Sequence, residues 1–173
     1  RHNETALGLS VHTSVLIDSH TSDCRCEAPI ARIHWRSVTL REETIQLAEL
    51  TLSLVDIRSE SRDEQTLAEH VGHTMEPLGL VERQRTNEFL LYTTDRDPSL
   101  PFVVLAGHLD TVPAQGNLPG RFDGGDVVGL GAADMKGGLG VMIQLAYWLA
   151  RERPRRGVDV AFLFFAREEL PVS

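Results

Sequence analysis

Five side chains in the second half of the sequence are of the types that bind divalent metal ions and move protons. His108 and Asp110 lie in the segment His-Leu-Asp-Thr-Val-Pro, and Asp134 lies in Gly-Ala-Ala-Asp-Met-Lys-Gly-Gly. Glu168 and Glu169 are adjacent, close to the last residue given. One imidazole and four carboxylates offer the nitrogen and oxygen ligands that suit zinc in hydrolytic sites. The set therefore favours a metal-dependent hydrolytic centre.

The spacing of His108 and Asp110 allows the two side chains to cooperate. In an extended segment, residues two apart point the same way. Asp110 can then reach the ring nitrogen of His108 that is not used for metal, which fixes the tautomer and strengthens the imidazole as a ligand. A single His-x-Asp is a weak signal. The buried strand before it and the Thr-Val-Pro after it favour the functional interpretation.

Two interpretations of Asp134 are open. The glycines around it let the chain bend sharply just before a predicted helix. Asp is a good helix N-cap, so capping is the ordinary interpretation. The alternative is a carboxylate whose two oxygens bridge two cations. The presence of the other metal-binding segments in the same sequence favours this second interpretation.

Glu168 and Glu169 follow the apolar run 160–165. Two like charges at the end of a buried strand are costly unless a cation or solvent compensates them. Adjacent side chains point in different directions, so one can bind the metal while the other takes a proton from water.

Apolar periodicity indicates the elements that must position these groups. It predicts helices over 39–55, from the capping pair Ser61 and Glu64 to Gly79, and over 136–152. Strands are expected at 80–86, 89–94, 102–106, 127–128 and 158–165. This order predicts an α/β fold, a three-layer sandwich around a mixed, largely parallel sheet. The chemical segments follow the carboxyl ends of buried strands, where such sheets bind ligands.

Residues 1–36 differ from the rest, and the predicted domain covers 37–173. The first segment shows no sustained period, and its apolar run 15–17 is isolated, so we expect a disordered or non-native leader. His20, Cys24 and Cys26 lack a fourth ligand at a suitable spacing for zinc. His70 and His73, three residues apart on a helix, are more often solvent-facing than metal-binding.

Composition limits the partners. The net charge is -8 and the pI is about 5.3, which argues against nucleic-acid or anionic-membrane binding. Two cysteines make no disulfide framework, so a cytoplasmic location is expected. Lys136 is the only lysine.

The series Gly129-x-Gly131-x-x-Asp134 departs from a dinucleotide-binding fingerprint at its third glycine. A non-catalytic interaction domain with the same fold is a further alternative interpretation of the chain.

The three segments resemble, in order and spacing, the co-catalytic zinc metallopeptidase family of aminoacylases, carboxypeptidases and deacylases. The resemblance covers about residues 39–173. Within the family, Asp-Thr-Val-Pro, Gly-Asn-Leu-Pro at 116–119 and Arg-Glu-Glu-Leu-Pro are most similar to succinyl-diaminopimelate desuccinylases. Acetylornithine deacetylases and carboxypeptidases are the nearest alternatives.

The resemblance implies a role for each residue. His108 and Glu169 would each bind one of two Zn²⁺ ions, with Co²⁺ or Mn²⁺ as alternatives. Asp134 would bridge the two ions, and its peptide bond to Met135 would be cis. Asp110 would orient His108, and Glu168 would be the general base. The substrate would be a small N-acyl amino acid, hydrolysed at its amide bond by a homodimeric parent enzyme.

This sequence departs from the family pattern after Glu169. A further acidic ligand, a last histidine ligand and a dimerisation domain are expected there and do not occur in the 173 residues. Each zinc would keep two protein ligands where a catalytic site has three. We therefore expect an N-terminal fragment that is inactive by itself.

Overall fold

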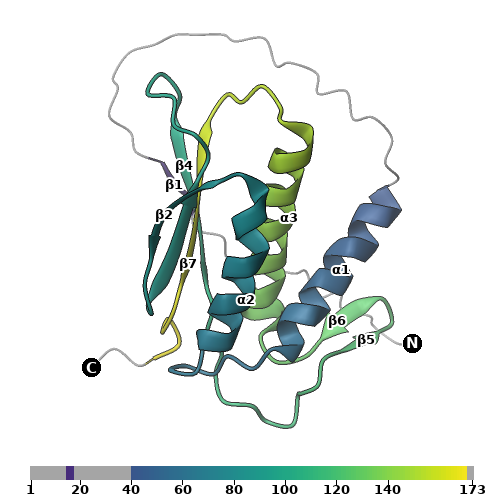
Figure 1. Cartoon of the computed structure of the whole chain (residues 1–173). Helices are drawn as coiled ribbons and strands as arrows, with labels where there is room; N and C mark the ends of the chain where they lie inside the picture. Colours follow the sequence, from purple (N-terminus) through teal and green to yellow (C-terminus); the bar gives the residue numbers. More distant parts are fainter. Residues whose placement is uncertain (1–14, 18–39, 171–173) are drawn as a thin grey trace.

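The computed structural model describes residues 15–17 and 40–170 (Figure 1). Its helices are α1 (Leu40–Asp56), α2 (Gln65–Met75) and α3 (Gly137–Glu152), with helical turns η1 (Glu76–Leu78) and η2 (Ala132–Lys136). Its strands are β1 (Val15–Ile17), β2 (Val81–Arg85), β3 (Phe89–Thr93), β4 (Phe102–His108), β5 (Arg121–Asp123), β6 (Asp126–Val128) and β7 (Asp159–Phe165). The predicted helices and buried strands are confirmed in order, with ends shifted by a few residues.

Five strands form the main sheet in the order β1-β4-β7-β3-β2. The predicted mixed sheet is confirmed, but the expectation of a largely parallel one is wrong for the described strands. Only β4 and β7 pair in parallel, while β1–β4, β3–β7 and β2–β3 are antiparallel. A parallel pair needs a long crossover, which α3 provides between β4 and β7. The connection of β2 to β3 is too short for anything but a hairpin.

The three helices lie on one side of the sheet (Figure 1). The described residues thus supply two layers of the predicted sandwich, the sheet and one layer of helices. No helix in this part of the chain is both long and apolar enough to cross a membrane.

The core between the sheet and α3 fixes where the helix begins. Leu139 and Ile143 of α3 and Phe162 and Phe164 of β7 are all fully buried. Burying one side chain of this size contributes about 1.5–3 kcal/mol. Gly107, near the end of β4, permits the close approach, because a Cβ there would lie 2.8 Å from Leu139 Cδ2. The start of α3 is thereby held over the carboxyl end of β4.

Residues 15–17 form a strand, which the expectation of an unstructured leader did not include. They pair with residues 103–105 at the edge of the sheet. The exposed N–H and C=O groups of an edge strand accept any short extended segment, and three residues carry too little pattern to predict this. The remainder of 1–36, including Cys24 and Cys26, lies outside the described residues.

Candidate metal centre

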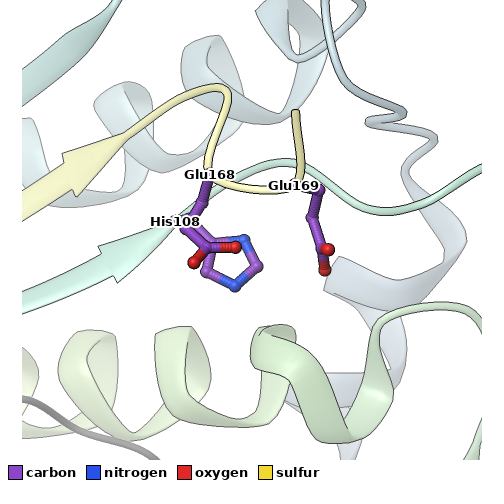
Figure 2. A group of neighbouring side chains, drawn as sticks. All are labelled: His108, Glu168 and Glu169. Carbon is purple, nitrogen blue, oxygen red and sulfur yellow. The ribbon is translucent and has the colours of Figure 1, made fainter. Parts of the chain in front are cut away.

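The parallel pairing of β4 and β7 brings the first and last chemical segments together. His108 is the last residue of β4 and lies beside Phe165, the last residue of β7. The loop after β7 then carries Glu168 and Glu169 back toward the imidazole (Figure 2). One ligand atom from each of the three side chains lies within 4.8 Å of the others. Such a cluster of one nitrogen and two oxygens can hold a divalent cation.

Asp134 lies next to the imidazole of this cluster. Its Oδ1 lies 3.0 Å from His108 Nε2, although the Asp134 side chain is 77% exposed. Asp134 leaves helical geometry, with φ -134° and ψ 100°, and its peptide bond to Met135 is cis. The residue before α3 is Lys136 and no side chain caps that helix end, so Asp134 is not the N-cap. The capping interpretation of Asp134 is therefore wrong.

The two ring nitrogens of His108 face different partners. Nδ1 lies 3.0 Å from the main-chain oxygen of Asp110 and 3.5 Å from Oδ1 of the same residue. A carbonyl oxygen only accepts, so the tautomer that fits carries its proton on Nδ1. Nε2 then presents a lone pair toward the Asp134 carboxylate. Two such groups 3.0 Å apart are stable only with a proton or a cation to share, which suits a metal ligand pair.

The Asp110 carboxylate organises the loop after β7. It is 1% exposed and accepts the main-chain N–H groups of Glu168 at 2.9 Å and Glu169 at 3.0 Å. It also accepts the hydroxyl of Ser61 at 2.7 Å. Sequence reasoning linked Asp110 to His108 alone. Hydrogen bonds from a carboxylate to main-chain N–H groups leave no pattern in the sequence, so these contacts were missed.

The surroundings of Glu169 disfavour its charged form. Partial burial raises the pKa of Glu169, and the nearby Asp134 carboxylate raises it further, while His108 acts in the opposite direction. Glu168 is exposed. A divalent cation would offset the repulsion that the carboxylates exert on one another.

Lys136 is a part of the site that sequence reasoning did not identify. It is 1% exposed, and its Nζ donates to the main-chain oxygen of Ile57 at 2.6 Å. Burial lowers the pKa of Lys136 to about 8, and Asp56 counteracts part of this shift. The ammonium group thus fastens the turn that carries Asp134 to the carboxyl end of α1.

The remaining histidine and cysteine candidates do not join this centre. His70 and His73 lie on α2, and in the described part of the chain neither belongs to a group of three possible ligands. The His20, Cys24 and Cys26 tract is outside the described residues.

Comparison with known proteins agrees with this geometry. Residues 104–172, which include all five candidate residues, match the sequence profile of peptidase family M20/M25/M40. The chain belongs to this family. A succinyl-diaminopimelate desuccinylase of Corynebacterium glutamicum is 42% identical over 123 residues, 70% of this chain and 33% of that protein. The chain therefore spans about a third of the length of this relative.

Solved structures show the same fold. A tripeptidase from Staphylococcus aureus superposes with a TM-score of 0.63 and 24% identity, over 73% of this chain and 37% of its own. A peptidase of the M20 family from Bacillus subtilis, described as binding a dinuclear metal centre, gives a TM-score of 0.56 and 18% identity, over 75% of this chain and 36% of its own. At these identities the likeness concerns the fold.

Proposed function

We propose that this chain supplies the first part of the catalytic domain of a longer metal-dependent hydrolase, which cleaves the amide bond of N-succinyl-diaminopimelate. The convergence of His108, Glu168 and Glu169 within 4.8 Å, with Asp134 Oδ1 3.0 Å from the imidazole, carries the proposal. The relative from C. glutamicum, 42% identical over the shared region, supports the choice of substrate.

The side chains fit two Zn²⁺ ions, with Co²⁺ or Mn²⁺ as alternatives. Imidazole and carboxylate groups suit all three metals. The dinuclear centre of the peptidase from B. subtilis supports a pair of ions. His108 and Glu169 would each hold one ion, and Asp134 would contribute to both, since its carboxylate has two oxygens and its side chain is 77% exposed.

The remaining residues would move and align groups in the reaction. Bound divalent cations polarise an amide carbonyl and lower the pKa of an attacking water. Glu168, exposed beside the cluster, would take a proton from the attacking water and pass it to the leaving amine. The Asp110 carboxylate accepts hydrogen bonds from the main-chain N–H groups of Glu168 and Glu169, and so holds both acids in place beside His108.

The missing ligands would come from the longer protein. Three residues per ion are usual in catalytic zinc sites, and these side chains give two. We propose that residues 1–173 alone bind zinc weakly and turn over no substrate, and that a further acid and a histidine downstream complete the site. Tight, stoichiometric zinc in the 173-residue chain would contradict this.

The activity is tested in the full-length protein with Glu168→Gln. The change keeps the size of the side chain and removes its basicity, and we expect a loss of about 10²–10⁴-fold in kcat. Glu49→Gln, on an exposed position of α1, is the matched control and should keep full activity. Hydrolysis of N-succinyl-diaminopimelate is compared with that of N-acetylornithine. Unchanged turnover in the Glu168 variant would disprove its role as the base.

Three alternatives have different signatures. Preference for N-acetylornithine or a peptide would indicate a deacetylase-like or carboxypeptidase-like enzyme. A full-length protein that binds no metal would indicate a non-catalytic interaction domain. Nucleotide binding is the least favoured, because the strand before the glycine loop, β6, pairs with β5 in a separate two-stranded sheet.

The setting of the parent enzyme follows from the same assignment. We propose a cytoplasmic homodimer that acts on a small N-acyl amino acid, with neither nucleic acid nor membrane as a partner. The net charge of -8 supports the last point, because anionic surfaces would repel such a protein.

A further inference from the structure

Three segments of the chain meet at the Asp110 carboxylate. Its Oδ1 accepts the Glu168 N–H, and its Oδ2 accepts both the Glu169 N–H and the Ser61 hydroxyl. Oδ1 also lies 3.5 Å from Nδ1 of His108. A buried carboxylate is costly unless donors surround it. Of the three hydrogen-bond donors, Ser61 offers the only side chain, so it is the one that substitution can remove.

The main chain holds Ser61 in place from both sides. The Ser61 N–H donates to the Thr111 oxygen at 3.1 Å, and the Thr111 N–H donates to the Ser59 oxygen at 2.9 Å. Glu60 and Thr111 form a parallel β-bridge between these bonds. The loop between α1 and α2 is therefore attached to the residue that follows Asp110. Ser61 reaches Asp110 from a fixed backbone.

The Ser61 hydroxyl has no role in starting α2. The predicted capping pair would require Ser61 to bond the first turn of that helix. Instead, α2 begins after Glu64, with no side-chain cap. The Glu64 carboxylate accepts the Arg62 N–H at 2.7 Å. The prediction that Ser61 and Glu64 form a capping box is wrong, and the hydroxyl is committed to Asp110.

We propose that Ser61 is a positioning residue of the metal centre. By donating to Oδ2, it fixes the rotation of the Asp110 carboxylate. That rotation sets the alignment of the main chain at Glu168 and Glu169, whose N–H groups donate to the carboxylate, and it keeps Oδ1 3.5 Å from Nδ1 of His108. The inference rests on the proposed function, since it supposes that these side chains bind metal. Loss of such a supporting hydrogen bond typically weakens metal binding by about 10–100-fold.

The test compares metal binding by full-length protein carrying serine, alanine or threonine at position 61. Zn²⁺ affinity is measured by competition with a chelator, and the geometry of the centre by the visible absorption bands of bound Co²⁺. Ser61→Ala should lower the affinity by about 10-fold or more and shift the Co²⁺ bands. Ser61→Thr keeps a hydroxyl, so its Zn²⁺ affinity and its Co²⁺ bands should match those of the parent protein. Ser53→Ala removes an exposed hydroxyl that bonds Leu50 within α1, and should change neither.

Two results would overturn the inference, and they differ from each other. If the parent protein binds metal and Ser61→Ala matches it in affinity and spectrum, the role of Ser61 is refuted while the proposed function stands. If the parent protein itself binds no metal, both fail. Should Ser61→Ala not fold, the nearly isosteric pair Ser61→Thr and Ser61→Val gives the same comparison, because the two differ only in the hydroxyl.

Discussion

The main-chain N–H of His108 donates to the Sδ of Met135 at 3.1 Å. The two residues lie 27 positions apart, one at the end of β4 and the other beside Asp134 in the turn before α3. The contact links the strand that carries the imidazole to the turn that carries Asp134. Sulfur is a weak acceptor, but His108 is only 5% exposed, and its N–H would otherwise be buried without a partner.

Met135→Leu should therefore lower the free energy of unfolding by more than an ordinary exchange of one apolar side chain for another. Such exchanges usually cost less than about 1.5 kcal/mol. Leaving the His108 N–H unpaired should add about 1–3 kcal/mol to the loss of unfolding free energy. Met142→Leu is the matched control, because Met142 is 2% exposed and its sulfur also lies close to Gly107. Denaturant unfolding measures both variants, and equal losses would refute the importance of the sulfur contact.

Gly131→Ala should damage both the fold and the metal centre. Gly131 has φ +74°, and a Cβ there would lie 2.6 Å from Thr111 Cγ2 and 3.3 Å from the Asp134 oxygen. The left-handed backbone costs alanine about 1–2 kcal/mol, and the overlap should add about 1–3 kcal/mol.

Gly79→Ala isolates the first contribution, the cost of the left-handed backbone. Gly79 has nearly the same φ, +71°, with nothing within 4 Å of the added Cβ. It should lose only the backbone part of the unfolding free energy and keep the metal affinity of the parent protein. Equal stability and equal metal affinity in the two variants would show that the turn can absorb the extra methyl group.

Much of this architecture was predictable because it depends on apolar pattern. The runs that became β4 and β7 are continuous and buried, and α3 has a regular apolar face, so their types and order followed from the sequence. Since β4 and β7 pair in parallel, the segments after them meet, as the prediction of a site at the carboxyl ends of strands requires. The sequence therefore predicted that His108 and Glu169 would lie close together, and the structure confirms this proximity.

What escaped prediction depends on long-range contacts between polar groups and main chain. A Ser and a Glu three residues apart give the same signal whether or not the serine caps a helix, so the bond from Ser61 to Asp110 was hidden. Lys136 reads as a surface residue by type, yet it is buried because two carbonyl groups at the end of α1 accept its ammonium group. The balance of parallel and antiparallel pairs depends on which strands become neighbours, which periodicity does not encode.

Glu169→Gln should stabilise the metal-free protein at neutral pH while it abolishes metal binding. The pKa of Glu169 in the folded protein is raised above its usual 4.5, mainly by burial and next by Asp134. Below the unfolded pKa both states are protonated, and this residue contributes no difference. As the pH rises through the folded pKa, the unfolded state ionises first and the folded state loses stability. At a pH above the folded pKa, the folded protein carries the full loss of stability that comes from the ionised Glu169.

Thermal unfolding in chelator measures this effect. The Tm of Glu169→Gln should exceed that of the parent chain at pH 7, and the two should converge near pH 4. The exposed Glu49→Gln makes the same change in net charge and should leave the Tm nearly unchanged at both pH values. A lower Tm for Glu169→Gln at pH 7 would mean that its carboxylate stabilises the metal-free fold.

Because Lys136 is the only lysine, an amine-specific reagent reports directly on opening of the turn that carries Asp134. Its pKa of about 8 leaves much of the amine neutral at pH 8.5, so protonation is no barrier to reaction. Its burial is the barrier, and labelling should be at least about a hundredfold slower in the folded chain than in denaturant, since it must await local opening. Added Zn²⁺ should slow it further in the full-length protein, because metal that joins Asp134 to His108 disfavours opening. Peptide mapping separates this label from those on the N-terminal amine and on any lysine elsewhere in the full-length protein, and Lys136→Arg gives the background. Labelling as fast in the folded chain as in denaturant would show that the turn is not fastened to α1.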